Sequence, residues 1–204
     1  DTADILCIAI DSATHTAVLC DENKTPIRDA IHWTDSRSVK ETKELNEKYG
    51  EEILKLSYHK PGVFWTMPQL LWVKNNEPEN FSKIRHIFFE KDYIRYLLTD
   101  VFCTDYIEAE GSMLFSSEKM CWSHKLCEIA GISETYLPPI KKPTDIIGSI
   151  TEKAAEVTGL TIGTPVICGT TDTVMEVFAG GAVNKGDVTV KLATAGRICV
   201  ITDK

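Results

Sequence analysis

Apolar and polar positions follow two different patterns along the chain, and each change of pattern predicts a change between strand and helix. Residues 5–10 form a continuous apolar run of strand length, which is typical of a strand buried on both faces. A second apolar run, 16–20, is followed by turn-forming residues 21–24 and then by 26–33, which predicts a hairpin. We therefore expect the chain to begin with three strands.

A helical period replaces this pattern after Asp35. Apolar side chains recur at helical spacing up to Gly50, a residue type that commonly ends helices, so we predict a helix between these positions. Similar patterns predict helices at 68–74, 91–98, 123–130, 151–157 and 173–182, and strands at 87–89, 166–168, 187–192 and 197–202. Strands interleaved with helices in this order predict an α/β protein.

Composition and net charge indicate which kinds of molecule the chain could bind. The 204 residues are 43% hydrophobic and 25% charged, which predicts a globular chain with a sizeable core. No apolar run approaches the roughly 20 residues that span a bilayer. The net charge is −8 and no cluster of Lys and Arg occurs, which argues against nucleic acid and acidic lipid. We expect a small-molecule partner, no nucleic acid and no membrane, and a second copy of the chain could form a homodimer.

The seven cysteines are odd in number, contain no C-x-x-C pair and mostly lie in apolar strand-like runs. This pattern indicates reduced thiols and a cytoplasmic location. Cys121, His124 and Cys127 could hold zinc, but a fourth ligand at suitable spacing is missing, so the pattern favours packing on a helix face. We predict no metal-binding motif. The absence of Met at position 1 is a first indication of truncation.

The first stretch that could carry chemistry ends in Asp172. An apolar strand stops at Gly169, small polar residues follow, and the carboxylate stands at the first turn of the next helix. Ligand sites of α/β folds lie outside the carboxyl ends of strands. An Asp in this place could accept a proton from a hydroxyl during phosphoryl transfer. Taken alone, however, the spacing favours an ordinary helix cap.

The second stretch is the turn between the last two predicted strands, formed by Ala193, Thr194, Ala195 and Gly196. Small side chains let backbone N–H groups approach a phosphate, and the glycine can adopt a positive φ. A plain hairpin turn has the same composition, and the pattern does not choose between the two.

The third stretch combines residues 11–15 with 31–37. Polar residues, among them Thr14 and His15, interrupt apolar strands near their ends. Trp33 offers an aromatic face with Asp35 and Arg37 beside it, as in a pocket for a polyol. Without other information, a capped helix start at Asp35 with Trp33 in the core is favoured.

Together these stretches resemble the FGGY-type carbohydrate kinases of the xylulokinase kind. Residues 8–21 resemble G-I-S-G-Q-M-H-G with a following strand, and 30–37 resemble A-I-x-W-x-D-x-R. The later matches are 68–72 to P-K-L-L-W, 91–99 to K-D-Y-L-R-Y-x-L-T, 104–115 to T-D-x-x-x-A-S-x-T-x-L-F, and 163–172 to G-T-P-V-x-x-G-x-x-D. These matches occur in the same order as in the family and cover nearly the whole chain. It is therefore a poor explanation that all three site-like patterns are incidental.

The resemblance implies a fold of two ribonuclease-H-like, actin-like ATPase domains around a cleft. It implies that Asp172 is the catalytic base and that the turn at 193–196 touches the ATP phosphates. It also implies that Thr14, His15, Trp33 and Thr173 hold the sugar, and we add Asp35 as a substrate-binding candidate. ATP with Mg²⁺ is the implied cofactor, in which the metal bridges phosphate oxygens.

Several positions depart from the family pattern. Ala13 and Thr14 replace the Gln and Met of Q-M-H, Thr173 replaces Asn, Gln or Ala, and G-T-S-G becomes a turn that starts at Ala193. Three of these four changes touch the implied sugar pocket, so they put the identity of the sugar in doubt. The added methyl group at Ala193 is small enough for phosphate approach.

Family members begin with a strand that carries D-x-G-T and end with a long domain that holds the adenine, and neither pattern occurs in this chain. The resemblance therefore implies that residues 1–185 form an N-terminal sugar-binding domain that is incomplete at its start. Residues 186–204 would be the first strands of the C-terminal ATP-binding domain. We expect the isolated fragment to bind ATP poorly and to be inactive.

The expected function is ATP-dependent phosphorylation of a sugar or polyol hydroxyl, with a xylulose-like ketose as substrate. The alternative is a non-catalytic actin-like sugar-binding or regulatory module, which the altered pocket and the missing phosphate loop suggest. An unrelated Rossmann-type binder is weaker, because no G-x-G-x-x-G turn follows any predicted strand.

Overall fold

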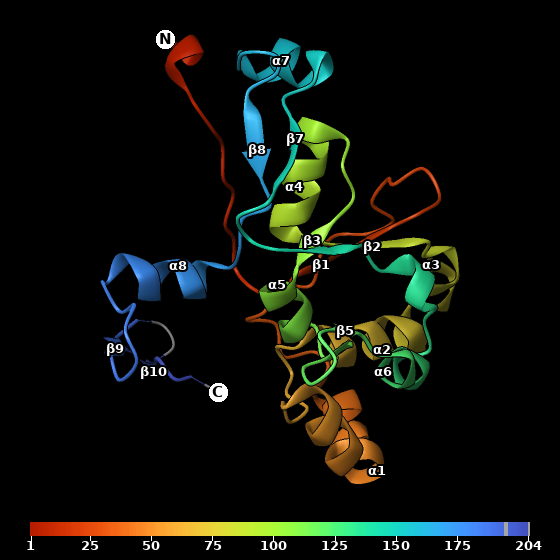
Figure 1. Cartoon of the computed structure of the whole chain (residues 1–204). Helices are drawn as coiled ribbons and strands as arrows, with labels where there is room; N and C mark the ends of the chain where they lie inside the picture. Colours follow the sequence, from red (N-terminus) through yellow and green to blue (C-terminus); the bar gives the residue numbers. More distant parts are fainter. Residues whose placement is uncertain (194–195, 204) are drawn as a thin grey trace.

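The structure is a computed structural model, and it describes residues 1–193 and 196–203. The predicted mixture of strands and helices is present (Figure 1). The helices are α1 (Val39–Ser57), α2 (Thr66–Asn76), α3 (Pro78–Lys83), α4 (Glu90–Thr99), α5 (Tyr106–Gly111), α6 (His124–Ala130), α7 (Glu152–Thr158) and α8 (Asp172–Ala179), with 3₁₀ turns at Thr2–Asp4 and Glu134–Tyr136. The strands are β1 (Ala17–Cys20), β2 (His86–Phe89), β3 (Thr104–Asp105), β4 (Phe115–Ser116), β5 (Cys121–Trp122), β6 (Ile140–Lys141), β7 (Ile146–Ser149), β8 (Pro165–Ile167), β9 (Val188–Lys191) and β10 (Arg197–Val200).

Strand pairing brings distant parts of the chain together. β1 pairs with β2, β4 with β5, β7 with β8, and β9 with β10, all antiparallel, whereas β3 and β6 are parallel. The N-terminal segment runs beside β8 (Figure 1) and joins it through a parallel bridge between Ile8 and Val166. Farther along, Ser12 bridges Thr171 in the same parallel sense. The loop at residues 11–15, called the first loop below, therefore lies beside the start of α8.

Two predictions for the first strands are wrong in detail. Residues 5–10 form an extended segment with an isolated bridge instead of a full strand. The segment after Pro26 makes only an isolated bridge to Cys20, and β1 pairs with β2 instead. Proline lacks the N–H that a ladder needs. In contrast, Ile87, Phe88 and Phe89 of β2 are fully buried, so pairing with β2 removes more apolar surface from water.

Helix α1 also differs from its prediction, because it continues through Gly50 and ends at Ser57. Ile53, one turn beyond the glycine, is fully buried in the main core. Tyr58 then closes the helix with a left-handed φ of 59°. Burying Ile53 stabilises the chain by roughly 1.5–3 kcal/mol, which exceeds the cost of about 1 kcal/mol for a glycine inside a helix.

The predicted helix ends at α6 and α7 are confirmed by their capping contacts. The Ser123 hydroxyl accepts a hydrogen bond from Leu126 N, and the helix ends at Gly131 with a φ of 76°. The Thr151 hydroxyl accepts from Ala154 N, and Gly159 has a φ of 72°. These ends depend on contacts within a few residues, so local sequence predicts them well. No helix in the described ranges is long and apolar enough to cross a membrane.

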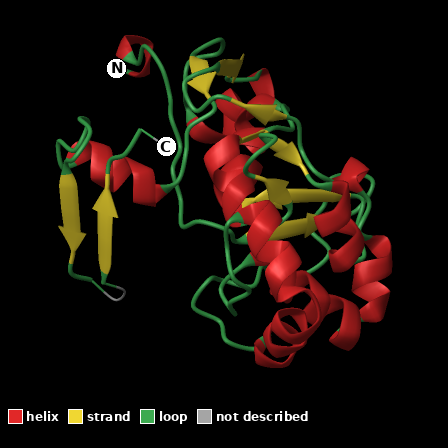
Figure 2. Cartoon of the chain, turned by 60° about the horizontal axis from the view of Figure 1, so that its bottom comes forward, coloured by secondary structure: helices red, strands yellow, loops and turns green. Residues whose placement is uncertain are grey.

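The C-terminal elements lie to one side of the rest of the chain. Figure 2 shows α8 and the hairpin of β9 and β10 beside, and partly separate from, the main body. Lys191 of the hairpin pairs with Glu176 of α8 at 2.5 Å. Val190 and Ile198 remain 64% and 71% exposed, so the hairpin contributes little to the apolar core.

Gly169, directly after β8, is held where a side chain does not fit. Its φ is +72°, and a Cβ atom there would lie 2.2 Å from the carbonyl oxygen of Ile10. We expect Gly169→Ala to destabilise the full-length protein by roughly 3 kcal/mol, because backbone strain and a backbone clash add. Urea unfolding would measure the change. In Gly163→Ala the φ of +83° is similar but nothing lies within 4 Å, so a loss of only about 1 kcal/mol is expected. Equal losses in both variants would contradict the predicted clash.

Candidate active site

A cavity of about 630 Å³ lies where the first loop, the start of α8 and the C-terminal hairpin meet. Residues 13–15 line it from the first loop, and Trp33 and Asp172 line it from two other segments. Lys191, Ala193, Gly196 and Arg197 contribute the hairpin side. The structure thus brings together the three stretches that the sequence selected separately.

Asp172 is the first residue of α8, and Thr171 occupies the N-cap position. Its backbone N–H donates to the carbonyl of Ser12 at 3.1 Å. Carboxylate Oδ1 accepts from Thr173 N at 2.6 Å and from the Thr173 hydroxyl at 3.3 Å. Among the described residues no contact engages Oδ2. The carboxylate is therefore oriented through one oxygen at the wall of the cavity.

The loop before Asp172 is held by hydrogen bonds at Cys168 and Thr170. The guanidinium of Arg95 donates to the carbonyl of Cys168. The hydroxyl of Thr170 donates to Asp105 Oδ1 at 3.2 Å. The donor and the acceptor of each bond are buried, so water does not compete for these two hydrogen bonds. The position of Asp172 thus depends on contacts from α4 and β3.

His15 stands on the first loop in an uncommon left-handed conformation, with a φ of 65°. Its Nε2 lies 2.7 Å from the Thr14 hydroxyl, and its ring packs on Trp65 with centroids 4.4 Å apart. Burial, with smaller contributions from His59 and Arg197, lowers the pKa of His15 to about 3. The imidazole is therefore neutral at physiological pH and acts as a hydrogen-bonding group there.

Aromatic rings form part of the cavity wall. Trp33, a candidate from the sequence, lines the cavity. Phe64 and Trp65 also line it, although the sequence did not indicate them. The rings of Phe64 and Trp65 lie 4.8 Å apart, and Trp65 also contacts His59 at 4.5 Å. Flat apolar rings beside a few polar groups are typical of small-molecule pockets. The adjacent aromatic pair before α2 is the sequence signal that could have identified these two residues.

Asp35 lies outside the residues that line this cavity in the described part of the chain. Its Oδ2 accepts from Arg37 Nη2 at 2.7 Å, and the Arg37 guanidinium stands 4.8 Å from the ring of Trp72. Hydrogen bonding to Arg37 holds the pKa of Asp35 below its usual value. The carboxylate is thus engaged with Arg37, and its role toward a substrate stays a prediction.

The hairpin contributes two cations that the sequence did not single out. Lys191 and Arg197 line the cavity together with Ala193 and Gly196. Thr194 and Ala195, the other residues of the selected turn, lie outside the described residues. Lysine and arginine are the side chains that bind phosphate oxygens. Lys191 is already paired with Glu176, whereas Arg197 forms no ion pair with a described residue, so Arg197 is the cation through which this side of the cavity suits an anionic group.

The described residues contain no cluster of His, Cys, Asp and Glu that could hold a metal ion by itself. Cys127, one of the candidate zinc ligands, is buried in the main core. Cys121 is exposed at the surface. The structure thus places Cys127 as a packing residue of the core.

Comparisons with known proteins find a matching family model and similar proteins. A model of the FGGY family of carbohydrate kinases, N-terminal domain, matches residues 1–179. The chain is 32% identical to a xylulose kinase of Bacillus subtilis over 96% of its own length and 39% of that protein. A gluconokinase of Bacillus licheniformis is 27% identical over 97% of this chain and 39% of that protein.

The fold comparison gives the same assignment. The crystal structure of xylulose kinase from Rhodospirillum rubrum matches with a TM-score of 0.93 and 27% identity. The match covers 98% of this chain and 42% of that one, so the chain spans well under half the length of these relatives. It confirms the predicted α/β, actin-like ATPase fold class.

Proposed function

Because this chain belongs to the FGGY family of carbohydrate kinases, we propose that the full-length protein phosphorylates a hydroxyl of a sugar or polyol with ATP. The observation that supports this proposal most is the cavity lining, which combines the Asp172 carboxylate with polar and aromatic side chains and with Lys191 and Arg197 of the hairpin. A xylulose-like ketose is the first candidate substrate, supported by the similarity to xylulose kinases.

In this proposal Asp172 accepts the proton of the attacking hydroxyl. The two bonds from Thr173 to Oδ1 keep the carboxylate oriented, which leaves Oδ2 for the substrate. The neutral imidazole of His15 and the Thr14 hydroxyl bind other hydroxyl groups of the sugar, and Trp33 covers an apolar face. Positioning of this kind supplies most of the catalysis in phosphoryl transfer.

The hairpin side fits the phosphate groups of a nucleotide. When bound, ATP with Mg²⁺ would supply the phosphoryl group and neutralise part of its charge. Arg197 would attract the phosphates, with Lys191 shared with Glu176, and the small residues Ala193 and Gly196 allow close backbone approach. Since no metal cluster occurs in the described part of the chain, Mg²⁺ would be held largely through the nucleotide.

We further propose that residues 1–185 belong to the sugar-binding domain and 186–204 to the first strands of the ATP-binding domain. Support comes from the family match, which ends at residue 179, and from the separate position of β9 and β10 (Figure 2). The departures at Ala13, Thr14 and Thr173 lie at the cavity, so they are the positions where sugar preference would differ from that of relatives.

A panel of ketoses, aldoses and polyols, assayed with the full-length protein by coupled ADP release, tests the proposal. We expect one ketose or polyol to be turned over at least about tenfold more efficiently than the others, a discrimination worth about 1.4 kcal/mol. Calorimetry without ATP would measure sugar binding separately. Binding of a sugar without any ATP-dependent transfer would instead favour a non-catalytic sugar-binding module.

A further inference from the structure

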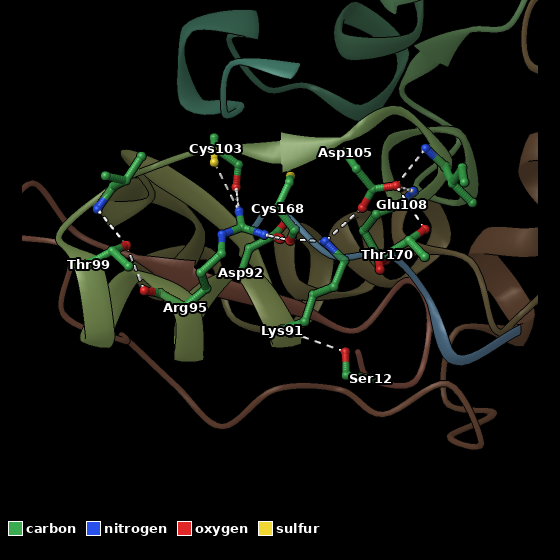
Figure 3. A network of polar contacts seen from close by, with 12 residues as sticks. Ser12, Lys91, Asp92, Arg95, Thr99, Cys103, Asp105, Glu108, Cys168 and Thr170 are labelled. Carbon is green, nitrogen blue, oxygen red and sulfur yellow. Dashed lines mark hydrogen bonds and ion pairs between the residues drawn. The ribbon is translucent and has the colours of Figure 1, made fainter. Parts of the chain in front are cut away.

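A cluster of buried charges contacts the two loops that carry His15 and Asp172, because Glu108 binds the His15 N–H and Asp105 binds the Thr170 hydroxyl. Figure 3 labels the charged residues of this cluster. All of its members are fully buried although each side chain can carry a charge. They are Lys91, Asp92 and Arg95 of α4, Asp105 of β3 and Glu108 of α5. A buried charge is costly unless it is paired, so the charges in this cluster should balance.

The charges of the first four members of this cluster balance each other. Lys91 Nζ lies 2.6 Å from Asp92 Oδ1 and 2.8 Å from Asp105 Oδ2. Arg95 Nη1 lies 3.0 Å from Asp92 Oδ1. Two cations therefore face two carboxylates, and an ionised Glu108 would add one unbalanced negative charge in a site that water does not reach.

Two contacts lead from this cluster to the first loop: the Lys91 backbone N–H donates to the Ser12 hydroxyl at 3.1 Å, and Glu108 binds the backbone of His15. Glu108 Oε1 accepts the backbone N–H of His15 at 2.6 Å, and among the described residues no partner reaches Oε2. Burial raises the pKa of Glu108 to about 8; Asp92 and Asp105 also raise it, while Lys91 and the His15 N–H lower it. A neutral acid keeps its carbonyl oxygen as an acceptor, so protonation satisfies this bond and the charge balance together.

His15 needs such support because its left-handed backbone is unfavourable for a residue with a Cβ. Its carbonyl accepts from the Thr66 hydroxyl at 2.7 Å, and its N–H is held by Glu108. Its ring fills the space above Gly111, where a Cβ would lie 2.0 Å from Nδ1. Of these contacts, only the one with Glu108 joins His15 to the charged cluster.

We propose that Glu108, kept as a neutral carboxylic acid, is a positioning residue that holds His15 in its left-handed conformation and so maintains the sugar-binding side of the cavity. The part that concerns sugar rests on the proposed function. The part that concerns protonation does not, because it can be measured on folding alone.

The folding measurement compares wild type with Glu108→Gln, which keeps the carbonyl acceptor and cannot ionise. A folded-state pKa near 8 lies above the ordinary value of 4.5, so the folded protein holds a proton that the unfolded chain releases. The contribution of Glu108 to stability is then complete below pH 4.5 and is lost as the pH rises toward 8. We expect the urea midpoint of the Gln variant to rise relative to wild type across this range. Parallel curves would overturn the proposal.

Glu110→Gln is the matched control, because Glu110 lies on the same helix and binds the Ser117 hydroxyl instead. Because Glu110 raises the pKa of the nearby His59, the stability curve of Glu110→Gln should rise slightly relative to wild type, but by less than that of Glu108→Gln. A rise equal to that of Glu108→Gln would show that the effect is not specific to Glu108 and would count against the proposal.

The sugar measurement is calorimetry between pH 7 and 9 on the same full-length proteins. Wild-type affinity should fall at least fivefold as Glu108 ionises, whereas the affinity of Glu108→Gln should stay within twofold over this range.

A kinetic measurement uses Glu108→Leu, which removes the acceptor. In the coupled ADP-release assay this variant should raise KM for sugar at least tenfold with a smaller change in kcat. An unchanged KM in a folded Leu variant, or a parallel pH fall in the Gln variant, would overturn the positioning role. Absence of sugar binding by wild type would refute the proposed function, while the stability curves would still decide the protonation of Glu108.

Discussion

Replacing Asp172 with asparagine in the full-length protein is expected to lower sugar phosphorylation by about a thousandfold, the scale of general-base catalysis. Asparagine keeps an oxygen that can accept the two bonds from Thr173, so the start of α8 should be preserved. What it removes is the ability to accept a proton. Sugar affinity by calorimetry should change by no more than about threefold, because the chemical step and not binding is affected.

Glu152→Gln is the matched control for this variant. Glu152 is the first residue of α7 after the N-cap Thr151, just as Asp172 is the first residue of α8 after Thr171. The control therefore removes the same favourable interaction with a helix N-terminus, far from the cavity. Its turnover in the coupled ADP-release assay should equal that of wild type. Near-normal turnover of Asp172→Asn would remove Asp172 from the mechanism.

The second large effect is expected on stability, from Lys91→Met. This change leaves Asp92 and Asp105 buried without the ammonium that lies 2.6 and 2.8 Å from them. Burial alone would lower the pKa of Lys91, but the surrounding carboxylates raise it above its usual value, so the ammonium is present throughout the neutral range. Removal of one partner from a buried ion pair costs about 3–5 kcal/mol, which urea unfolding would measure.

Lys43→Met serves as the control, since Lys43 forms an exposed pair with Glu47 at 3.9 Å. Its effect should stay below about 1 kcal/mol. A loss below about 1 kcal/mol for Lys91→Met would contradict the proposed balance of buried charge.

Local signals predicted much of the secondary structure. Helices α2, α4, α6 and α7 lie within one or two residues of their predicted ranges, because caps and helical periods involve near neighbours. The prediction failed where distant packing decided the outcome. Gly50 is a stop signal by local rules, but the core beyond it holds Ile53, and the partner of β1 proved to be β2.

Some residues of the candidate site could be predicted from local sequence and others could not. Asp172, His15 and Trp33 could be selected because polar or aromatic residues stood out at the ends of apolar runs. Lys191 and Arg197 could not, because each looks like an ordinary surface residue of a hairpin until the hairpin is placed beside the cavity. For Asp35 the structure shows an ion pair with Arg37 that the sequence pattern leaves open.

The sequence by itself determined the longer helices, the strands β1, β2, β8, β9 and β10, the family resemblance and the carboxylate at the start of α8. Only the tertiary structure decided which side chains meet, and Glu108 is the sharpest case. In the sequence it is one acidic residue among many, whereas in the fold it is fully buried against the backbone of a residue 93 positions away. Burial and charge balance are properties of the packed chain, so no local pattern around position 108 could reveal them.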